Sequence, residues 1–180
     1  VLRETQLVVC LLFQYAGMSF VDFAHLKERN IKNGILDYNR QKTGTPMRLE
    51  ILDTAELMRK ELMGDKRPAS GYLFPFLSGT KTGYEEYLEY NAALSRFNRN
   101  LKTLKEVAGI ASDVTSYTIR HSFAMALKEQ NVPIEMISEL LGHKSIKTTQ
   151  IYLRSFSLEK MTVVNKSCFE NVYNYMPEVG

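Results

Sequence analysis

The chain has few of the residues on which disulfide scaffolds and metal centres depend. Its 180 residues include two cysteines, Cys10 and Cys168, which lie near opposite ends and form no CxxC motif. We therefore expect neither a disulfide framework nor a structural zinc site. The three histidines, His25, His121 and His143, have no neighbouring ligands at usable spacing, so no metal is expected. No P-loop or GxGxxG motif points to a nucleotide cofactor. This cysteine usage favours a reduced, cytoplasmic protein.

Long apolar segments and a strong excess of charge are also missing. The longest apolar run near the N-terminus, Leu7 to Phe13, is too short to span a bilayer and lacks the basic leader of a signal peptide. The net charge of +3 permits contact with nucleic acid but does not by itself indicate it. A hydrophobic content of 44% is ordinary for a globular protein and excludes disordered and collagen-like classes. The length suits one domain, and because the chain begins with Val1 we expect it to be part of a longer protein.

Hydrophobic periodicity predicts a mainly helical α+β domain with one small antiparallel sheet at an edge. The sheet comes from a hairpin with strands at 35–38 and 49–52 and a turn at 42–45. Helices are predicted over 4–15, 20–26, 53–62, a long segment containing Leu94 to Ala108 and ending near Gly109, 116–130, 133–141, 145–153 and 158–175. Asp53 and Glu56 are interpreted as a capping box for the helix that begins there.

The segment from Thr115 to Tyr152 contains the side chains with the most informative chemistry. Arg120 lies on the flank of an apolar helix face, His143 directly follows a helix-ending glycine, and Tyr152 comes nine residues later. An arginine can bond two phosphate oxygens, a histidine can donate to a third, and a tyrosine hydroxyl can attack phosphorus. Each residue taken singly is more often a helix cap or a packing residue. Their combination favours a phosphate site.

This segment resembles the catalytic domain of the tyrosine recombinases, the phage integrase family. The family's second box, with its Arg-His-(Thr/Ser)-Phe-Ala core, matches 120–124, its Leu-Gly-His matches 141–143, and its nucleophile matches Tyr152. Upstream, Gly-Met-Ser-Phe-Val-Asp-Phe at 17–23 aligns with the family's first box, and Lys42 falls in the hairpin that carries the family's catalytic lysine. The resemblance covers almost the whole chain. It implies a DNA-cleaving and rejoining enzyme that needs neither metal nor nucleotide.

The resemblance assigns a role to each matching residue. Tyr152 is expected to attack the scissile phosphate and to hold the DNA as a 3′-phosphotyrosyl intermediate. Arg120 and His143 are expected to bond the non-bridging oxygens, and His121 belongs to the same box. Lys42 is expected to protonate the departing 5′-oxygen.

Two positions depart from the family pattern. Ser19 stands where the family has its first catalytic arginine, and a serine lacks both the charge and the bidentate fork. Tyr117 stands where the second box has its first histidine and still offers a hydroxyl. Asp22 occupies the first box's acidic position, where it is expected to orient its neighbours.

The missing arginine leaves three interpretations: an inactive relative, a slower enzyme, or an enzyme in which another arginine has moved into the site. Arg3, Arg29 and Arg40 are the candidates for that replacement, and the sequence does not choose among them. The sequence around Ser19 resembles that of a branch of integrases from conjugative transposons in which this arginine is also absent. The resemblance therefore favours an active enzyme of a bacterial mobile element, associated with the nucleoid.

The partner implied by the resemblance is double-stranded DNA. Basic side chains are expected to contact its phosphates with little sequence information; they are Arg96, Arg99, Lys144, Lys147 and Arg154. A solvated helix face is the alternative for Arg96 and Arg99. Strand exchange implies a tetramer on DNA, with accessory DNA-bending proteins, a monomeric isolated domain, and a separate N-terminal DNA-binding domain upstream of 1–180. The predicted helix at 158–175 either docks on a neighbouring subunit or packs on its own chain.

Three rival interpretations stay open. A type IB topoisomerase shares the chemistry but yields relaxed rather than recombined DNA. A non-catalytic DNA-binding relative forms no covalent adduct. A structural helical domain shows no salt-dependent retention on DNA.

Overall fold

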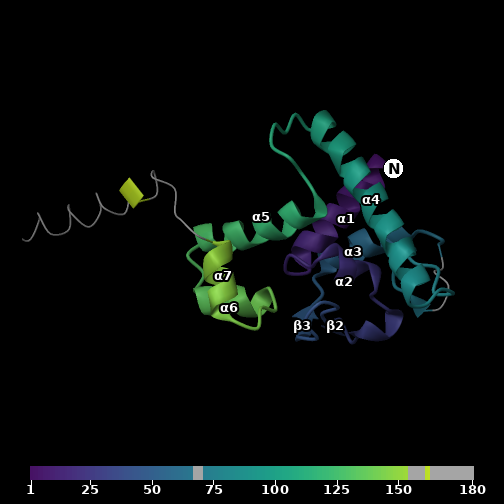
Figure 1. The fold of residues 1–180 in the computed structure, drawn as a ribbon, viewed down its shortest axis with the longest axis horizontal. Coiled ribbons are helices and arrows are strands. Elements are labelled where there is room, and N and C mark those ends of the chain that lie inside the picture. The colour runs from purple at the N-terminus through teal and green to yellow at the C-terminus, as the bar shows by residue number, and fades with distance from the viewer. Residues whose placement is uncertain (67–70, 154–160, 163–180) are drawn as a thin grey trace, which may run out of the picture.

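The computed structural model describes residues 1–66, 71–153 and 161–162, and within them one small sheet lies at an edge of a mainly helical domain (Figure 1). The mainly helical α+β fold predicted from the sequence is confirmed. The elements are α1 (Leu2–Gln14), α2 (Phe20–Ala24), the 3-10 turn η1 (Glu28–Asn30), β1 (Ile31–Lys32), β2 (Ile35–Asn39), β3 (Pro46–Glu50), α3 (Asp53–Met63), α4 (Tyr84–Val107), α5 (Ser116–Glu129), α6 (Ile134–Leu140) and α7 (Ile146–Tyr152).

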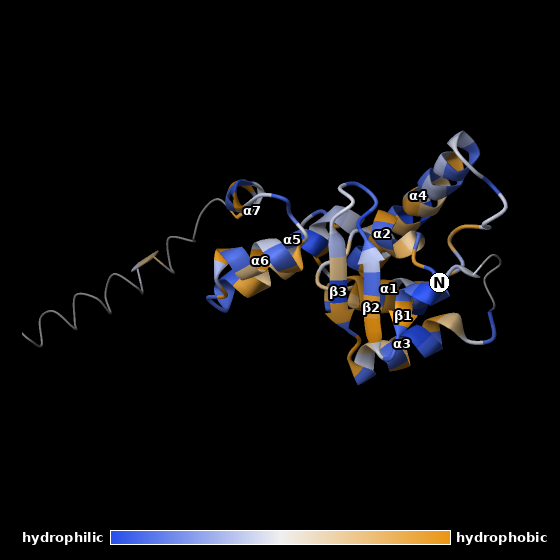
Figure 2. Cartoon of the chain, turned by 90° about the horizontal axis from the view of Figure 1, so that it is seen from below, coloured by the Kyte–Doolittle hydropathy of each residue, from blue (hydrophilic) through white to orange (hydrophobic). Residues whose placement is uncertain are grey.

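The sheet is antiparallel with the strand order β1-β2-β3, and Figure 2 shows the strands side by side. Leu36 pairs with Leu49 and Tyr38 with Met47, so alternate residues of both strands bury one face against the core. This alternation begins β3 at Pro46, three residues earlier than the predicted strand at 49–52. The two-residue strand β1 was not predicted because it is too short to show a periodicity.

The end of α1 is set by backbone conformation, and the start of α3 lacks the predicted side-chain cap. Ala16 and Gly17 have φ angles of +55° and +63°, which end α1 where the sequence predicts its stop. The capping box predicted for α3 is wrong. Leu52 is the N-cap residue and offers no side-chain cap, while Glu56 instead accepts two hydrogen bonds from Arg59, at 2.7 and 2.6 Å. Glu56 therefore forms an i,i+3 ion pair with Arg59 on the helix surface and does not cap the helix.

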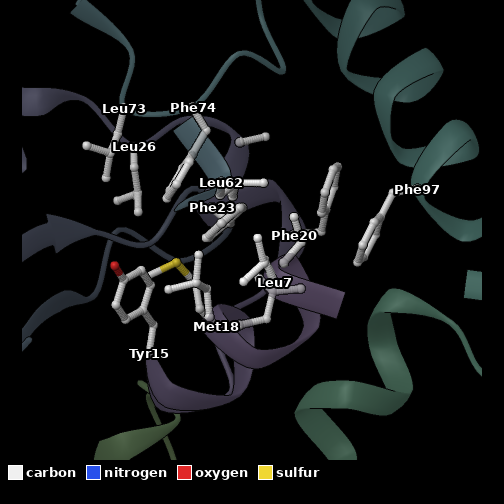
Figure 3. Close-up of a cluster of buried hydrophobic side chains, with 14 of the residues drawn as sticks. Leu7, Tyr15, Met18, Phe20, Phe23, Leu26, Leu62, Leu73, Phe74 and Phe97 are labelled. Carbon is white, nitrogen blue, oxygen red and sulfur yellow. The ribbon is translucent and has the colours of Figure 1, made fainter. Parts of the chain in front are cut away.

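The main core joins α1, α2, the sheet, α3, α4 and the start of α5. Aromatic rings stack at its centre (Figure 3): Phe23 lies 4.1 Å from Phe74, and Phe20 lies 4.7 Å from Phe97, between ring centroids. These rings anchor α2 between the loop before α4 and α4 itself. The same helix carries Asp22, so the core fixes the position of this carboxylate.

A second, smaller cluster forms where α5 meets α6 and α7. It consists of Ala124, Ile137, Leu141 and Leu153, with partly buried neighbours around them. Figure 1 shows α6 and α7 at the end of α5 away from α1, so α5 connects the two clusters. Ser145 caps α7 as predicted, accepting from the backbone N–H of Lys147 at 3.2 Å. The helix predicted at 158–175 lies outside the residues that the structure describes.

Candidate active site

Arg120 projects from α5 into the space between the two hydrophobic clusters and is only 6% exposed. Its Nη1 donates to the backbone carbonyl of Gly17 at 2.9 Å, and its Nη2 donates to the backbone carbonyl of Leu141. The first carbonyl belongs to the turn after α1 and the second to the end of α6. Arg120 therefore joins three segments that are far apart in the sequence.

Arg40 enters the same space from the end of β2 and is 8% exposed. Its Nη1 donates to the carbonyls of Leu141 and Gly142, both at 3.1 Å, and its Nε donates to Asp22 Oδ2 at 3.4 Å. The guanidinium groups of Arg40 and Arg120 thus converge on one carbonyl oxygen, that of Leu141. Of the three arginines considered for the missing position, the structure brings Arg40 into the site.

Asp22 is the acidic residue of this arrangement and is 2% exposed. Its Oδ2 accepts from Ser19 Oγ at 2.5 Å and from Arg40, and its Oδ1 accepts from the backbone N–H of Gln41 at 2.7 Å. Ser19, at the position of the absent arginine, therefore holds the carboxylate that in turn contacts Arg40. The role of Asp22 in orienting its neighbours stays a prediction.

The site has more positive than negative charge. Burial and the nearby charge of Arg40 lower the pKa of Arg120 to about 10, so its guanidinium stays protonated at neutral pH. Two buried cations face one carboxylate, Asp22, which leaves a surplus of one positive charge. A phosphate diester is an anion that would balance this charge.

His143 directly follows the shared carbonyls of Leu141 and Gly142. Its Nδ1 lies 2.8 Å from the hydroxyl oxygen of Thr149, a fully buried residue of α7. Burial and the charges of Arg120 and Arg40 lower the pKa of His143 to about 4. The imidazole is therefore neutral near pH 7 and has one N–H to donate.

Tyr152 lies at the end of α7 among three other rings. Its ring centroid is 5.1 Å from that of His121, 5.8 Å from that of Tyr117 and 6.0 Å from that of His143, all edge to face. Its hydroxyl is buried and has no hydrogen-bond partner within the described structure. Burial first, and Tyr117 second, hold the pKa of Tyr152 above its ordinary value. The phenol is therefore protonated at neutral pH and lies next to the Arg120 guanidinium.

The predicted residues Lys42, Tyr117 and His121 have exposed side chains. Lys42 lies in the connection between β2 and β3, two residues after Arg40. Tyr117 and His121 lie one helical turn apart on α5, and both contact the Tyr152 ring. The structure thus brings the residues of the α5 motif and Tyr152 together, as their spacing predicts.

Two of the candidate replacement arginines lie outside the site. Arg3 forms an exposed ion pair with Glu61, with Nε 2.7 Å from Oε1, so the structure does not bring it to the site. Glu61 lies on α3, which packs against α1, and this packing brings Glu61 into contact with Arg3. Arg29 is exposed on η1. Only Arg40 combines burial with contacts to both Asp22 and the Leu141 carbonyl.

The residues predicted to contact DNA have exposed side chains where the structure describes them. Lys144 follows His143 directly, and Lys147 lies in the first turn of α7, so both flank the site. Arg96 and Arg99 are on α4, and Arg96 lines a cavity of about 210 Å³ that includes none of the site residues. Arg154 lies outside the described residues. These five assignments stay predictions.

The described part of the chain has neither a cluster of metal-binding side chains nor a membrane-spanning helix. No group of three or more histidine, cysteine or acidic side chains there could hold a metal ion. No helix there is both long enough and apolar enough to cross a membrane.

The fold and the site define a class of protein: a mainly helical domain that places a tyrosine beside paired guanidinium groups and a neutral imidazole. These are the groups needed to transfer a phosphoryl group to tyrosine. A family model matches residues 3–159, and the chain belongs to the phage integrase family. The resemblance stated from the sequence is confirmed.

Among curated proteins, the chain is similar to tyrosine recombinase XerD of Lacticaseibacillus casei, with 42% identity over 69 residues. It is also 41% identical over 75 residues to tyrosine recombinase XerC of Rickettsia typhi. These matches cover 38% and 42% of this chain but only 24% of each relative. The chain thus matches about a quarter of the length of these relatives.

Solved structures share the fold at low sequence identity. The XerA recombinase superposes with a TM-score of 0.63 at 20% identity, covering 90% of this chain and 62% of the other. The Tn1549 transposon integrase with circular intermediate DNA gives 0.64 at 14% identity, covering 89% and 57%. A lambda integrase dimer bound to a COC′ core site gives 0.60 at 17% identity, covering 86% and 44%.

Proposed function

We propose that residues 1–180 form the catalytic domain of a site-specific DNA recombinase that cleaves and rejoins strands through a 3′-phosphotyrosyl intermediate. One observation carries the proposal: the buried guanidinium groups of Arg40 and Arg120 converge on the Leu141 carbonyl, beside His143 and Tyr152. Together with Asp22 these arginines leave one surplus positive charge. A scissile phosphate supplies one negative charge and gains a second as the transition state forms.

Each described side chain has a step in this reaction. The Tyr152 hydroxyl attacks phosphorus and releases its proton to solvent through the exposed Tyr117 hydroxyl. The bond from phosphorus to the 5′-oxygen breaks as the phosphotyrosyl bond forms, and Lys42 protonates that oxygen. Arg40, Arg120 and the neutral His143 donate to the non-bridging oxygens. Rejoining runs in reverse, with the 5′-hydroxyl attacking the phosphotyrosyl bond and Tyr152 leaving.

Arg40 takes the place of the arginine that is missing at Ser19. This assignment rests on its burial and on its contact with Asp22, which Ser19 also holds. It favours an active enzyme over an inactive relative, because the second guanidinium is present from another segment. It also supplies a positive charge and N–H donors that serine cannot.

The proposal extends to partners and context. The curated relatives are tyrosine recombinases, and the similar Tn1549 and lambda integrase structures contain DNA. Both observations support double-stranded DNA as the substrate. We assign the chain to a bacterial mobile element of the conjugative-transposon type, acting in the cytoplasm at the nucleoid. The similarity to the Tn1549 transposon integrase supports this. The active form is a tetramer on DNA with accessory DNA-bending proteins and an upstream DNA-binding domain, and the isolated domain is a monomer.

The experiment uses nicked duplexes that carry the element's end sequences, because a cleaved strand is trapped when its short fragment diffuses away. The protein is compared with Tyr152→Phe and with Tyr84→Phe, which alters an exposed tyrosine of α4. We expect a slowly migrating covalent adduct on denaturing gels with the protein and with Tyr84→Phe, and none with Tyr152→Phe. The upstream domain is restored if the fragment binds DNA poorly.

The rival functions give different results in the same assay. Tight DNA binding without an adduct in any variant would identify a non-catalytic relative. An adduct accompanied by relaxed but unrecombined DNA would identify a topoisomerase. Failure to bind DNA even at low salt would leave only a structural helical domain.

A further inference from the structure

Thr149 is a buried residue that contacts the His143 side chain. It is fully buried on α7, and its Oγ1 is 2.8 Å from His143 Nδ1. One turn further along the same helix is Tyr152, whose ring contacts the His143 ring. A single short helix therefore carries both the proposed nucleophile and the residue that hydrogen-bonds the His143 side chain.

A neutral imidazole carries its proton on either Nδ1 or Nε2, and the two tautomers present opposite chemistry. If Nδ1–H donates to Thr149, Nε2 offers a lone pair, which a phosphate oxygen repels. If the Thr149 hydroxyl donates to Nδ1, Nε2 carries the proton and can donate to that oxygen. The tautomer therefore decides whether His143 helps or hinders the reaction.

We propose that Thr149 is a positioning residue whose hydroxyl donates to His143 Nδ1 and holds the imidazole as the Nε2–H tautomer. The inference rests on the proposed function, since it names how one of that site's donors is prepared. Thr149 touches no substrate atom and acts through His143 alone.

The charges around His143 agree with this arrangement. Arg40 approaches from the end of β2, and Arg120 approaches from α5. Because the two guanidiniums disfavour a charged imidazole, His143 has a single proton to place. The buried threonine has no bulk water to serve as an alternative donor or acceptor, so its hydrogen bond to Nδ1 sets the position of that proton.

The test compares Thr149→Val, which keeps the shape and removes the hydroxyl, with Thr149→Ser, which keeps the hydroxyl. Thr148→Val is the matched control, because Thr148 is the preceding residue of the same helix and is exposed. We expect Thr149→Val to slow adduct formation about tenfold at unchanged DNA affinity, in line with the loss of one hydrogen bond. Thr149→Ser restores the rate, and Thr148→Val does not change it.

A second readout reports the tautomer directly. Long-range 1H–15N spectra of histidine-labelled protein distinguish Nε2–H from Nδ1–H, and His143→Gln identifies the signal. We expect the Nε2–H form in the protein and in Thr149→Ser, and a mixture of tautomers in Thr149→Val. A merely structural role for Thr149 would lower thermal stability without moving this signal.

The outcomes separate the inference from the proposed function. An Nδ1–H tautomer in the unaltered protein, or an unchanged rate in Thr149→Val, would overturn the role of Thr149. If the unaltered protein forms no adduct, the proposed function fails, and the spectra still decide whether Thr149 sets the tautomer.

Discussion

Replacing Arg40 with alanine removes the guanidinium that the structure places beside Arg120. The carbonyl of Gly142 loses its described side-chain donor, the carbonyl of Leu141 keeps Arg120, and Asp22 keeps Ser19 and the Gln41 N–H. If Arg40 supplies the donor that is absent at Ser19, its loss slows adduct formation on the order of 10²- to 10³-fold, the effect of removing one preorganised donor.

The same change has a cost in stability. Separating a buried ion pair typically lowers the unfolding free energy by about 3 to 5 kcal/mol. The long contact of 3.4 Å and the two remaining donors to Asp22 place the expected loss near the lower end, about 3 kcal/mol. For a chain of this size such a loss lowers Tm by roughly 6 to 12 °C. The assay must therefore run well below the melting point of the variant.

Two further variants separate charge, geometry and fold. Arg40→Lys keeps a positive charge near Asp22 but loses the planar fork, so we expect most of the stability to return while the rate stays at least about tenfold low. Arg3→Ala is the matched control, because Arg3 was an equal candidate from the sequence but lies in an exposed pair with Glu61. We expect it to leave adduct formation unchanged.

The measurement is the initial rate of adduct formation on nicked duplexes at saturating protein, with Tm determined in parallel. The reasoning is refuted if folded Arg40→Ala forms adduct at the rate of the unaltered protein. It is equally refuted if Arg3→Ala and Arg40→Ala slow the reaction to the same extent.

Two other predictions concern the turn at the end of α6 and the histidine that follows it. A Cβ added at Gly142, where φ is +60°, would overlap the Met47 sulfur and lie 2.8 Å from Arg40 Cδ, whereas at Gly44, where φ is +67°, it would meet nothing within 4 Å. Gly142→Ala should therefore lower both Tm and the adduct rate, while Gly44→Ala shows only the strain of its backbone, about 1 kcal/mol; equal effects of the two changes would contradict the close packing. Because the pKa of His143 is about 4 in the folded chain and ordinary when unfolded, the unfolded state binds more protons between these values, and the unfolding free energy falls as the pH drops from about 6.5 to about 4. Denaturant titrations should show a shallower fall in that window for His143→Gln, and identical pH profiles would contradict it.

Local patterns predict most of the elements of this domain. The helices from α1 to α7 follow from apolar spacing and from glycine or proline at their ends, and Ser145 caps α7 as its sequence position indicates. The misplaced capping box at Asp53 and Glu56 shows the limit of such patterns. Both residues lie in the first turn, but the Glu56 carboxylate pairs with Arg59 instead of returning to the backbone.

The motif residues of the site were also predictable, because α5 and α7 present them at helical spacing. Thr149 lies in the same segment, between Thr115 and Tyr152, but its role depends on a hydrogen bond to His143 that no periodicity encodes. Its only signal in the sequence is its place six residues after His143, on the helix that carries Tyr152. A threonine at that position is more often a packing residue, so the spacing alone does not assign it.

By itself, the sequence determined the helical α+β class, the family and the set of side chains available for phosphate chemistry. These depend on the spacing of residues close together in the sequence, which does not require tertiary contacts. The tertiary structure alone decided which of the three candidate arginines lies beside Arg120. Arg3, Arg29 and Arg40 are equivalent as sequence, but only Arg40 reaches the Leu141 carbonyl, 101 residues away along the chain, and the buried Asp22. Such a contact exists only after the two hydrophobic clusters have packed around α5, because burial then makes an unpaired guanidinium costly and pairs it with these oxygens.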